Sequence, residues 1–449
     1  MRLLETEHAT VYFGSNLDVL PTLEDNSVDS IVTDPPYELG FMGKKWDSSG
    51  IAYNVELWKE CLRVLKPGGH LLSFSGSRTY HRMTVAIEDS GFEIRDMISW
   101  ISNKTFPKSL DVSKAIDKQR NDKLEVISVV KKMKQALEFS GKSRSELDKI
   151  FGTKNVAQHW FSTDSDPRIV PADKWIIVKE WLKLDDSLDA EVWRLNGRKG
   201  KPGEAWSQRE VIDERNVPKG HSFASEKYGK ETGVKKIQET ISATPEAEKW
   251  QGWGTGLKPT VEPIVMARKP LNGTVAANVL EYGTGALNID GSRIGVEEIK
   301  INTFDNGAKP FGDAVGEPYT SKKSIGRWPA NAIIDDVVAE ALGDNSKFFY
   351  VPKASKVDRN EGLDKENNHP TVKPTALMSY LVKLVTPPNG IVLDPFTGSG
   401  STGKAAILEG FQFVGIELTE DYWPIIKGRL EHAETQLTEN KEKEGEQLF

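Results

Sequence analysis

The chain is poor in cysteine, in long apolar runs and in excess positive charge. Its 449 residues include one cysteine, which excludes a disulfide framework and a zinc site made of several thiolates. No apolar run approaches the length of a membrane span, and the first residues lack the apolar core of a secretory signal. We therefore expect a soluble, cytoplasmic protein. The net charge of −7 gives no general attraction to phosphate, so any nucleic-acid surface must be regional.

The single cysteine, Cys61, also argues against one mechanism. It lies in the helical pattern of residues 58–65 and is not in the Pro-Cys setting of enzymes that attack a cytosine ring with a thiolate. Cys61 is therefore expected in the core or on a helix surface. With 38% hydrophobic residues, a chain of this length can form two or three domains around at least one sizeable core.

A short polar motif follows an apolar strand pattern near the N-terminus. Residues 27–33 predict a buried strand, and Asp34, Pro35, Pro36 and Tyr37 come directly after it. The lone pair of an exocyclic amine on a nucleobase is delocalised into the ring, so a catalyst must hydrogen-bond the amine protons. The Asp34 carboxylate can accept one proton and the Pro35 carbonyl, in a rigid turn, can accept the other. By itself, the tetrapeptide is equally typical of a loop that ends a strand.

A second motif, near the C-terminus, has the order strand, glycine turn, helix. Residues 390–394 form a short apolar run, and glycines then punctuate a turn in which backbone can approach a cofactor closely. About 19 residues beyond Gly398, Glu417 ends a second apolar run, which is the placement of a ribose-binding carboxylate in doubly wound folds. The cofactor-binding candidates of the turn are Asp394, Pro395, Phe396, Gly398 and Gly400, and Gly403 is expected to belong to the same turn.

In this order, the two motifs resemble those of the beta class of DNA amino methyltransferases, in which the catalytic motif comes early and the S-adenosylmethionine motif comes near the C-terminus. The resemblance extends to residues 369–374, which are similar to the cofactor-covering motif of the family, and to the helical run 376–382. It implies an enzyme that uses S-adenosylmethionine and double-stranded DNA and is encoded by a bacterium or a phage. A homodimer and a cognate restriction endonuclease are both open possibilities.

The resemblance also implies roles for individual residues. Asp34 accepts a hydrogen bond from the target amine, the Pro35 carbonyl accepts a second, and Tyr37 stacks on the base. In the cofactor half, the implied roles are contact with methionine and adenosine for Asp394, Phe396, Gly398 and Gly400, ribose binding for Glu417, and closure over the donor for Thr371 and Lys373. The base is expected to rotate out of the duplex, because a stacked base does not expose its amine to an enzyme-bound donor.

Several alternatives stay open. In this family, an Asp in the first catalytic position is the usual adenine-N6 form and a Ser the usual cytosine-N4 form, so Asp34 favours adenine and cytosine-N4 is the alternative. A DNA-binding regulator on the same fold, without turnover, is disfavoured by the intact motifs. Methylation of RNA or of a protein glutamine is disfavoured by the early catalytic motif. A dinucleotide dehydrogenase fits less well, because residues 397–403 lack the G-x-G-x-x-G spacing.

The predicted fold is α/β, a doubly wound Rossmann-like methyltransferase sheet with an inserted helical module and a loop-rich recognition region. Strands are expected over 69–75, 91–100 at the sheet edge, 259–268 and 348–350, with a turn at 66–69. The predicted domains are 1–117, the catalytic half; 118–248, the inserted module; 249–277, return strands; 278–364, target recognition; 365–436, the cofactor-binding half; and 437–449, a charged tail.

The inserted module carries a helix-turn-helix pattern. Ser143 and Glu146 have the form of a capping box, and a second short helix is expected over 154–161. Its exposed face would present Lys154, Asn155, Gln158 and His159, and amide side chains are suited to pairing with adenine in the major groove. Residues 118–154 carry ten lysines and arginines against five acids, which favours DNA contact. An ordinary helical hairpin is the alternative.

The region 278–364 is rich in Gly, Asn and Asp, which is typical of a recognition surface rather than of a large core. Within it, Arg293 and Arg327 are candidates for phosphate or base contact. No cluster of His, Cys and acids has metal-ligand spacing, so no metal is expected.

Overall fold

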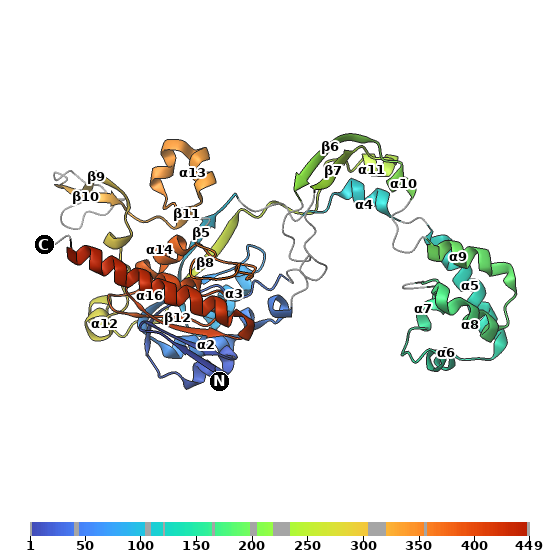
Figure 1. Cartoon of the computed structure of the whole chain (residues 1–449), viewed down its shortest axis with the longest axis horizontal. Helices are drawn as coiled ribbons and strands as arrows, with labels where there is room; N and C mark the ends of the chain where they lie inside the picture. Colours follow the sequence, from blue (N-terminus) through green and yellow to red (C-terminus); the bar gives the residue numbers. More distant parts are fainter. Residues whose placement is uncertain are drawn as a thin grey trace, which may run out of the picture. The chain divides into compact units, whose positions relative to one another are not determined.

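The chain folds into two compact units (Figure 1). Unit 1 comprises residues 1–106 and 259–449, and unit 2 comprises residues 107–258. The computed structural model describes residues 2–39, 45–103, 109–119, 122–163, 167–197, 204–218, 234–303, 320–353 and 357–446. Among these residues, no helix has both the length and the apolar character needed to cross a membrane.

Unit 1 is built on a nine-stranded sheet with the order β1-β2-β13-β12-β3-β4-β8-β5-β11. Its strands are β1 (Arg2–Glu5), β2 (Ala9–Phe13), β3 (Val28–Thr33), β4 (Leu65–Phe74), β5 (Glu93–Ile101), β8 (Val261–Arg268), β11 (Ala332–Ile334), β12 (Ile391–Asp394) and β13 (Gln412–Glu417). The run from β2 to β4 is parallel throughout, and β5 and β11 are parallel to each other. Only β1 and β8 run antiparallel to their neighbours among these strands.

Alternate side chains of the strands build a core on each face of this sheet. Val32 and Leu72 belong to one core, whereas their sequence neighbours Ile31 and Leu71 belong to the other. The first core is closed by α14 (Thr375–Val385), α15 (Ser401–Leu408) and α16 (Trp423–Glu446), and the second by α1 (Asn16–Val19), α2 (Val55–Val64) and α3 (Tyr80–Asp89). Helices on both faces confirm the predicted doubly wound α/β class.

A buried carboxylate fixes the register of the central strands. Asp29, near the start of β3, is 4% exposed. Its Oδ1 lies 2.6 Å from Lys66 Nζ at the start of β4, and its Oδ2 accepts the backbone N–H of Ile391, the first residue of β12, at 2.8 Å. One side chain therefore ties the entry ends of three adjacent strands together.

Three strand predictions need comment. The strand predicted over 259–268 is β8. The segment predicted at the sheet edge, 91–100, forms β5 but lies inside the sheet, because β11 adds beyond it and pairs Ile333 with Trp100. The turn predicted at 66–69 was wrong, because these residues form the irregular start of β4, where the register against β3 shifts.

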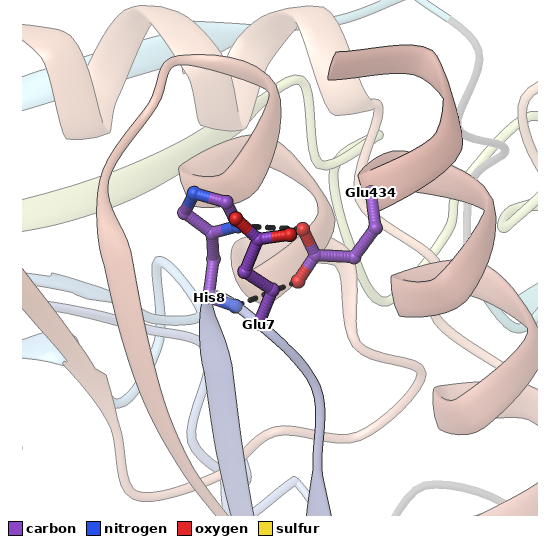
Figure 2. Close-up of side chains that lie close together, drawn as sticks. All are labelled: Glu7, His8 and Glu434. Carbon is purple, nitrogen blue, oxygen red and sulfur yellow. Dashed lines mark hydrogen bonds and ion pairs between the residues drawn. The ribbon is translucent and has the colours of Figure 1, made fainter. Parts of the chain in front are cut away.

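The turn before β2 is held against α16 (Figure 2). Glu434 accepts hydrogen bonds from the His8 backbone N–H at 2.8 Å and from the Thr6 hydroxyl at 2.7 Å, and its Oε2 lies 2.6 Å from His8 Nδ1. Glu7 brings a third potential metal ligand near this pair, but His8 and Glu434 already satisfy each other. The cluster therefore joins the N-terminal strands to α16.

The region 278–364 contains more regular structure than its composition suggests. It includes most of α12 (Val275–Tyr282), a hairpin of β9 (Ile294–Thr303) and β10 (Thr320–Arg327), and α13 (Asp336–Leu342). The strand predicted over 348–350 was wrong. A 3-10 helix, Gly343–Phe348, precedes Tyr350, which makes a single bridge to Ile333 and stacks its ring on Tyr380 at 4.0 Å.

Unit 2 contains a helical core of its own. Its helices are α4 (Val112–Lys118), α5 (Lys123–Ser140), α6 (Arg144–Ile150), α7 (Gln158–Phe161), α8 (Ala172–Leu182), α9 (Asp189–Gly197), α10 (Glu204–Ser207) and α11 (Pro245–Glu248). Side chains such as Met133, Leu147, Phe161 and Trp175 pack together within α5 to α9. The unit also contains the hairpin β6 (Val211–Pro218) and β7 (Val234–Thr240), so it is not purely helical.

The second helix of the predicted helix-turn-helix starts later than expected. Ser143 caps α6 by accepting the Glu146 backbone N–H, as predicted. The next helix begins at Gln158, not at Lys154. Asp148 causes this difference, because its Oδ1 accepts the backbone N–H groups of residues 156 and 157, each at 3.1 Å, and so stabilises a turn in place of a helical start.

The bounds of two predicted domains also differ from the observed elements. Unit 2 begins at residue 107 instead of 118 and ends at 258 instead of 248. The predicted charged tail 437–449 continues α16 as far as Glu446, and its last three residues lie outside the described residues.

A buried ion pair links α4 to the hairpin side of unit 2. Asp117 binds Arg209 through Oδ2, which also accepts the Ala243 backbone N–H at 2.9 Å, and its Oδ1 accepts the Thr244 hydroxyl at 2.7 Å. The two charged side chains are 0% and 2% exposed. Removing one partner would leave the other charge buried.

We expect Asp117→Ala to destabilise unit 2 by about 3 to 5 kcal/mol, because Arg209 would lose its buried counter-charge. Hydrogen exchange on the full-length protein, followed by mass spectrometry of peptides from 107–258, measures this effect. Glu214→Ala is the control, because the Glu214–Lys236 pair on the same hairpin is exposed and contributes little. Equal protection in the two variants would contradict the prediction.

Candidate active site

The two sequence motifs meet at the carboxyl ends of adjacent parallel strands. β3 lies beside β12 in the sheet, with Ile31 paired to Leu393. Thr33, the last residue of β3, donates its hydroxyl to Asp394 Oδ1 at 2.6 Å. Asp34 therefore follows directly after a side chain that is bonded to the glycine motif. The carboxyl edge of a parallel sheet is where open α/β folds bind their ligands.

Asp394 acts as a junction between these motifs. Besides Thr33, it accepts the Thr402 hydroxyl at 2.6 Å and the Phe396 backbone N–H at 3.0 Å. The side chain is 1% exposed, and burial raises its pKa to about 6 although these hydrogen bonds oppose the shift. Because both carboxylate oxygens are occupied, the main contribution of Asp394 in this structure is to hold β3, β12 and α15 in register.

Asp34 lies in a cluster of four polar side chains. Lys373 Nζ is 2.9 Å from Asp34 Oδ2, 3.1 Å from Glu262 Oε2 and 2.8 Å from the Tyr37 hydroxyl oxygen. The Tyr37 hydroxyl donates to Glu262 Oε2 at 2.8 Å. The turn after β3, the start of β8 and the segment before α14 thus converge on one point.

One acceptor in this cluster is left over. Asp34 Oδ1 is buried, and no described residue donates a hydrogen bond to it. A buried, unsatisfied carboxylate oxygen is costly unless a ligand supplies the donor. The mechanism predicted from the sequence assigns this donor to the target amino group.

The electrostatics of the cluster depend on burial and on the shared cation. Burial raises the pKa of Asp34, Lys373 opposes this shift and Glu262 adds to it. Burial lowers the pKa of Lys373, but the Asp34 and Glu262 carboxylates outweigh burial and raise it above its ordinary value. Lys373 is therefore a permanent cation in a site with two carboxylates.

Aromatic rings surround the Lys373 ammonium group. Its Nζ lies 5.2 Å from the centre of the Tyr37 ring, 4.7 Å from that of Phe74 and 5.9 Å from that of Trp100. These distances are within the range of cation–π attraction. Trp100 is on β5, directly opposite Glu262 on β8. The rings restrict Lys373 to this position.

The glycine turn has the backbone that its sequence predicted. Gly398 and Gly400 have φ of 56° and 76°, which L side chains rarely adopt. A Cβ at Gly398 would lie 3.1 Å from His369 Nε2. The expectation that Gly403 belongs to this turn was wrong. It lies inside α15, where a Cβ would lie 2.7 Å from the Phe413 ring, so its role is close packing of helix on strand.

Glu417, at the end of β13, closes the turn from the other side. Its Oε2 accepts the Gly398 backbone N–H at 2.7 Å and its Oε1 accepts the Thr419 backbone N–H at 2.8 Å. Burial raises the pKa of Glu417 to about 7, against the opposing effect of these hydrogen bonds. The predicted ribose-binding carboxylate is therefore beside the glycine turn.

The segment 369–373 places its two predicted residues differently. Thr371 is exposed, and its backbone N–H donates to His369 Nδ1 at 3.3 Å. Lys373 is 7% exposed and reaches Asp34. The lysine predicted as a cover over the donor thus contacts the carboxylate of Asp34. Pro395 accepts the Asn16 side-chain amide through its carbonyl at 3.4 Å.

This geometry agrees with comparisons to known proteins. A family model described as DNA methylase matches residues 28–428. The chain belongs to this N6/N4 DNA methylase family. The family assignment confirms the resemblance drawn from the sequence. It also confirms S-adenosylmethionine as the cofactor, which the resemblance implied.

Relatives and solved structures can be given individually. Type II methyltransferase M.SfiI of Streptomyces fimbriatus is 24% identical over 427 residues, 92% of this chain and 88% of the relative. DNA adenine methyltransferase YhdJ of Escherichia coli is 44% identical over 71 residues, 16% of this chain and 24% of the relative. PvuII DNA methyltransferase (cytosine-N4-specific) aligns over 94% of this chain and 86% of that chain, with 13% identity and a TM-score of 0.40. For the first curated relatives, the match spans no more than 38% of their own length.

Sequence reasoning missed a buried charge network behind the glycine turn of this methylase. Lys404, on α15, is 1% exposed and binds Asp358 at 2.8 Å and Glu361 at 2.6 Å. Arg429, on α16, donates to the Ser399 carbonyl at 3.0 Å. A lysine directly before the apolar run 405–408 of α15 was the available signal. The network attaches residues 358–361 to the cofactor half.

The predicted DNA-contact residues of unit 2 are exposed. Lys154 and Asn155 lie in the turn before α7, and Asn155 has a φ of 59°. Gln158 is the first residue of α7. The three side chains are thus on the surface, but two of them are not on the helix that was predicted to carry them.

Arg293 and Arg327, in unit 1, are both engaged by acids. Arg293 Nε lies 2.8 Å from Asp290, and its guanidinium group lies 5.7 Å from the centre of the Trp328 ring. Arg327 binds Glu297 at 2.8 Å across the β9–β10 hairpin. These pairs fix the two arginines close to an exposed tryptophan, 64% accessible.

The raised pKa of Glu417 predicts a pH dependence of stability. The folded chain holds a proton on Glu417 between about pH 4.5 and 7, whereas the unfolded chain has lost it, so this contribution to stability falls as pH rises through that window. The unfolding free energy of the wild type relative to Glu417→Gln should therefore decrease by up to roughly 3 kcal/mol from pH 4.5 to 7. Urea unfolding followed by circular dichroism measures it. A difference that rises with pH would contradict the assignment.

Proposed function

We propose that this protein is a site-specific DNA methyltransferase that moves a methyl group from S-adenosylmethionine to the N6 amino group of adenine in duplex DNA. The observation that carries the proposal is the position of Asp34. Its carboxylate follows the residue bonded to Asp394 of the glycine motif, and one of its oxygens is buried with no described donor. Family membership supplies the reaction class.

The residues of the glycine turn fit S-adenosylmethionine as the methyl donor. Gly398 and Gly400 adopt backbone that leaves the turn open to close approach, and a side chain at Gly398 would fill the space beside His369. Glu417 places a carboxylate at the same turn, suited to the ribose hydroxyls. When bound, S-adenosylmethionine supplies an electrophilic methyl carbon on a sulfonium.

In the proposed mechanism, Asp34 and the Pro35 carbonyl hold the two protons of the target amine and draw its lone pair out of the ring. Tyr37 stacks on the base, which has been rotated out of the duplex. A bound donor would give up its methyl group to the amine with loss of its own carbon–sulfur bond, and the methylated nitrogen would carry one proton too many. That proton then leaves to Asp34 or to water. Pro36 keeps the turn rigid.

Adenine is proposed over cytosine because the first catalytic position is Asp34. The 71-residue match to an enzyme named as a DNA adenine methyltransferase favours the same base. Both amines need the same polarisation, so cytosine-N4 is the second candidate. Sequencing of DNA treated with the purified protein, with detection of the modified base, distinguishes the two.

Changing Asp34→Ala should lower the rate of methyl transfer by a factor of about 100 to 10,000, because the amine loses its acceptor. Binding of S-adenosylmethionine should change little, since Asp34 does not belong to the glycine turn. Transfer of tritiated methyl groups to DNA and isothermal titration with the donor measure the two properties. Retained turnover would remove the catalytic assignment, and Glu93→Ala on β5 serves as a matched acidic control.

We further propose that unit 2 and the region around Arg293 and Arg327 recognise DNA sequence. Unit 2 supports this role through exposed Lys154, Asn155 and Gln158 next to a locally basic stretch. The hairpin region supports it through two arginines beside the exposed Trp328. A homodimer and a cognate restriction endonuclease stay as further possibilities for this protein.

We expect Lys154→Ala to weaken binding to all DNA duplexes and to reduce the dependence of binding on salt, because a lost phosphate contact carries no sequence information. Gln158→Ala should instead relax discrimination between sites, by about 1 to 3 kcal/mol at one base pair. Fluorescence anisotropy with specific and random duplexes at several salt concentrations measures both effects. Binding unchanged in both variants would exclude this turn from the interface.

A further inference from the structure

We propose that Glu262 and Lys373 together set the charge of Asp34: Lys373 keeps the carboxylate ionised and oriented, and Glu262 takes part of that cation so that Asp34 stays a strong acceptor. The inference rests on the proposed methyltransferase activity and assigns positioning roles that the motifs do not. Glu262 lies on β8, far from either motif in sequence, and Lys373 was expected at the methyl donor.

The geometry divides the ammonium group among three acceptors. An ammonium has three N–H donors. In this site they meet Asp34 Oδ2 at 2.9 Å, Glu262 Oε2 at 3.1 Å and the Tyr37 hydroxyl at 2.8 Å. The Tyr37 hydroxyl donates its hydrogen bond to Glu262, so every hydrogen-bond donor of the Lys373 ammonium group and of the Tyr37 hydroxyl has an acceptor. Asp34 Oδ1 is buried and has no donor among the described residues, and we assign it to the incoming amine.

The charge balance of this cluster suits the reaction. Two carboxylates share one cation, so Asp34, Glu262 and Lys373 carry a net charge of −1 when all are ionised. A sulfonium donor and the nitrogen that gains the methyl group both bear positive charge, and a preorganised negative site favours them. Asp394, bonded to Thr33, is a further buried carboxyl group, and the charge of Asp34 adds to the rise of the Asp394 pKa.

Lys373 and Glu262 have opposite effects on the ionisation of Asp34. Without Lys373, a buried carboxyl group beside Glu262 takes up a proton, so it is a weaker acceptor for the amine and cannot take the proton that the reaction releases. Without Glu262, Lys373 interacts with the carboxylate of Asp34 alone. That carboxylate then becomes a weaker hydrogen-bond acceptor and binds the released proton less strongly. The groups that face Asp34 are Lys373 before α14, Glu262 on β8, Tyr37 in its own turn and Asp394 on β12.

The pH dependence of kcat/KM for methyl transfer tests this proposal. Its acidic limb reports the ionisation of the acceptor in the free enzyme. We expect Lys373→Met to move that limb upward by about one to three pH units, and Glu262→Gln to move it downward by about one unit. Glutamine keeps the size of Glu262 and an acceptor for Tyr37, so this variant preserves the packing. A purely structural role would change rates without moving the limb in opposite directions.

Matched controls use the same substitutions outside the cluster. Glu93→Gln alters a carboxylate that binds Arg268 at the other end of β8, and Lys383→Met alters a half-buried lysine on α14 that binds Glu409. Neither should shift the limb. The proposal is overturned if the acidic limb of kcat/KM stays in place in Lys373→Met and Glu262→Gln, or if it moves in the same direction in both. Donor binding by calorimetry confirms that each variant is folded.

A second measurement separates this inference from the proposed function. If the wild type transfers no methyl group to any DNA, the proposed function fails. The unfolding free energy of Asp34→Asn relative to its parent, followed across pH in the wild-type, Lys373→Met and Glu262→Gln backgrounds, still reports the ionisation of Asp34. Opposite displacements of that titration in the two backgrounds support the charge-setting role, and coincident titrations overturn it.

Discussion

The hydrogen bond from Thr33 to Asp394 is the contact on which the candidate site depends. It joins residues 361 positions apart in the chain and does so in a place sealed from water, where a hydroxyl–carboxylate contact is strong. Asp29 aligns the entry ends of β3 and β12 and Thr33 aligns their exits. With both ends fixed, the turn that carries Asp34 and the turn that carries Gly398 have little freedom to separate.

In the polar cluster, burial of the Lys373 ammonium group costs free energy, but the same group holds its neighbours in place. Removing an ammonium group from water is costly, and two carboxylates with three aromatic rings compensate for that cost. Such an arrangement fixes directions as well as charges. Tyr37 is held by its hydroxyl, and Asp34 is held by Oδ2, whereas its Oδ1 has no donor among the described residues.

The sequence was sufficient where local chemistry determines local structure. The strand before the tetrapeptide 34–37, the positive φ of Gly398 and Gly400 and the Ser143 cap follow from residue types and spacing. It was insufficient where a distant side chain decides. Asp148 withdraws backbone donors that a helix from Lys154 would need, and only the folded chain shows that Lys373 lies beside Glu262. Gly403 reads as a turn residue because its true constraint, the Phe413 ring, comes from another strand.

The attachment of His8 to Glu434 places the first strands of unit 1 beside its last helix. A chain that ended just after Glu434, continued from there into the first strands and began between the two motifs would retain every neighbour in the sheet, while the glycine turn would then precede the tetrapeptide 34–37. Motif order along the polypeptide is therefore a matter of connectivity, and the geometry of the candidate site does not depend on it.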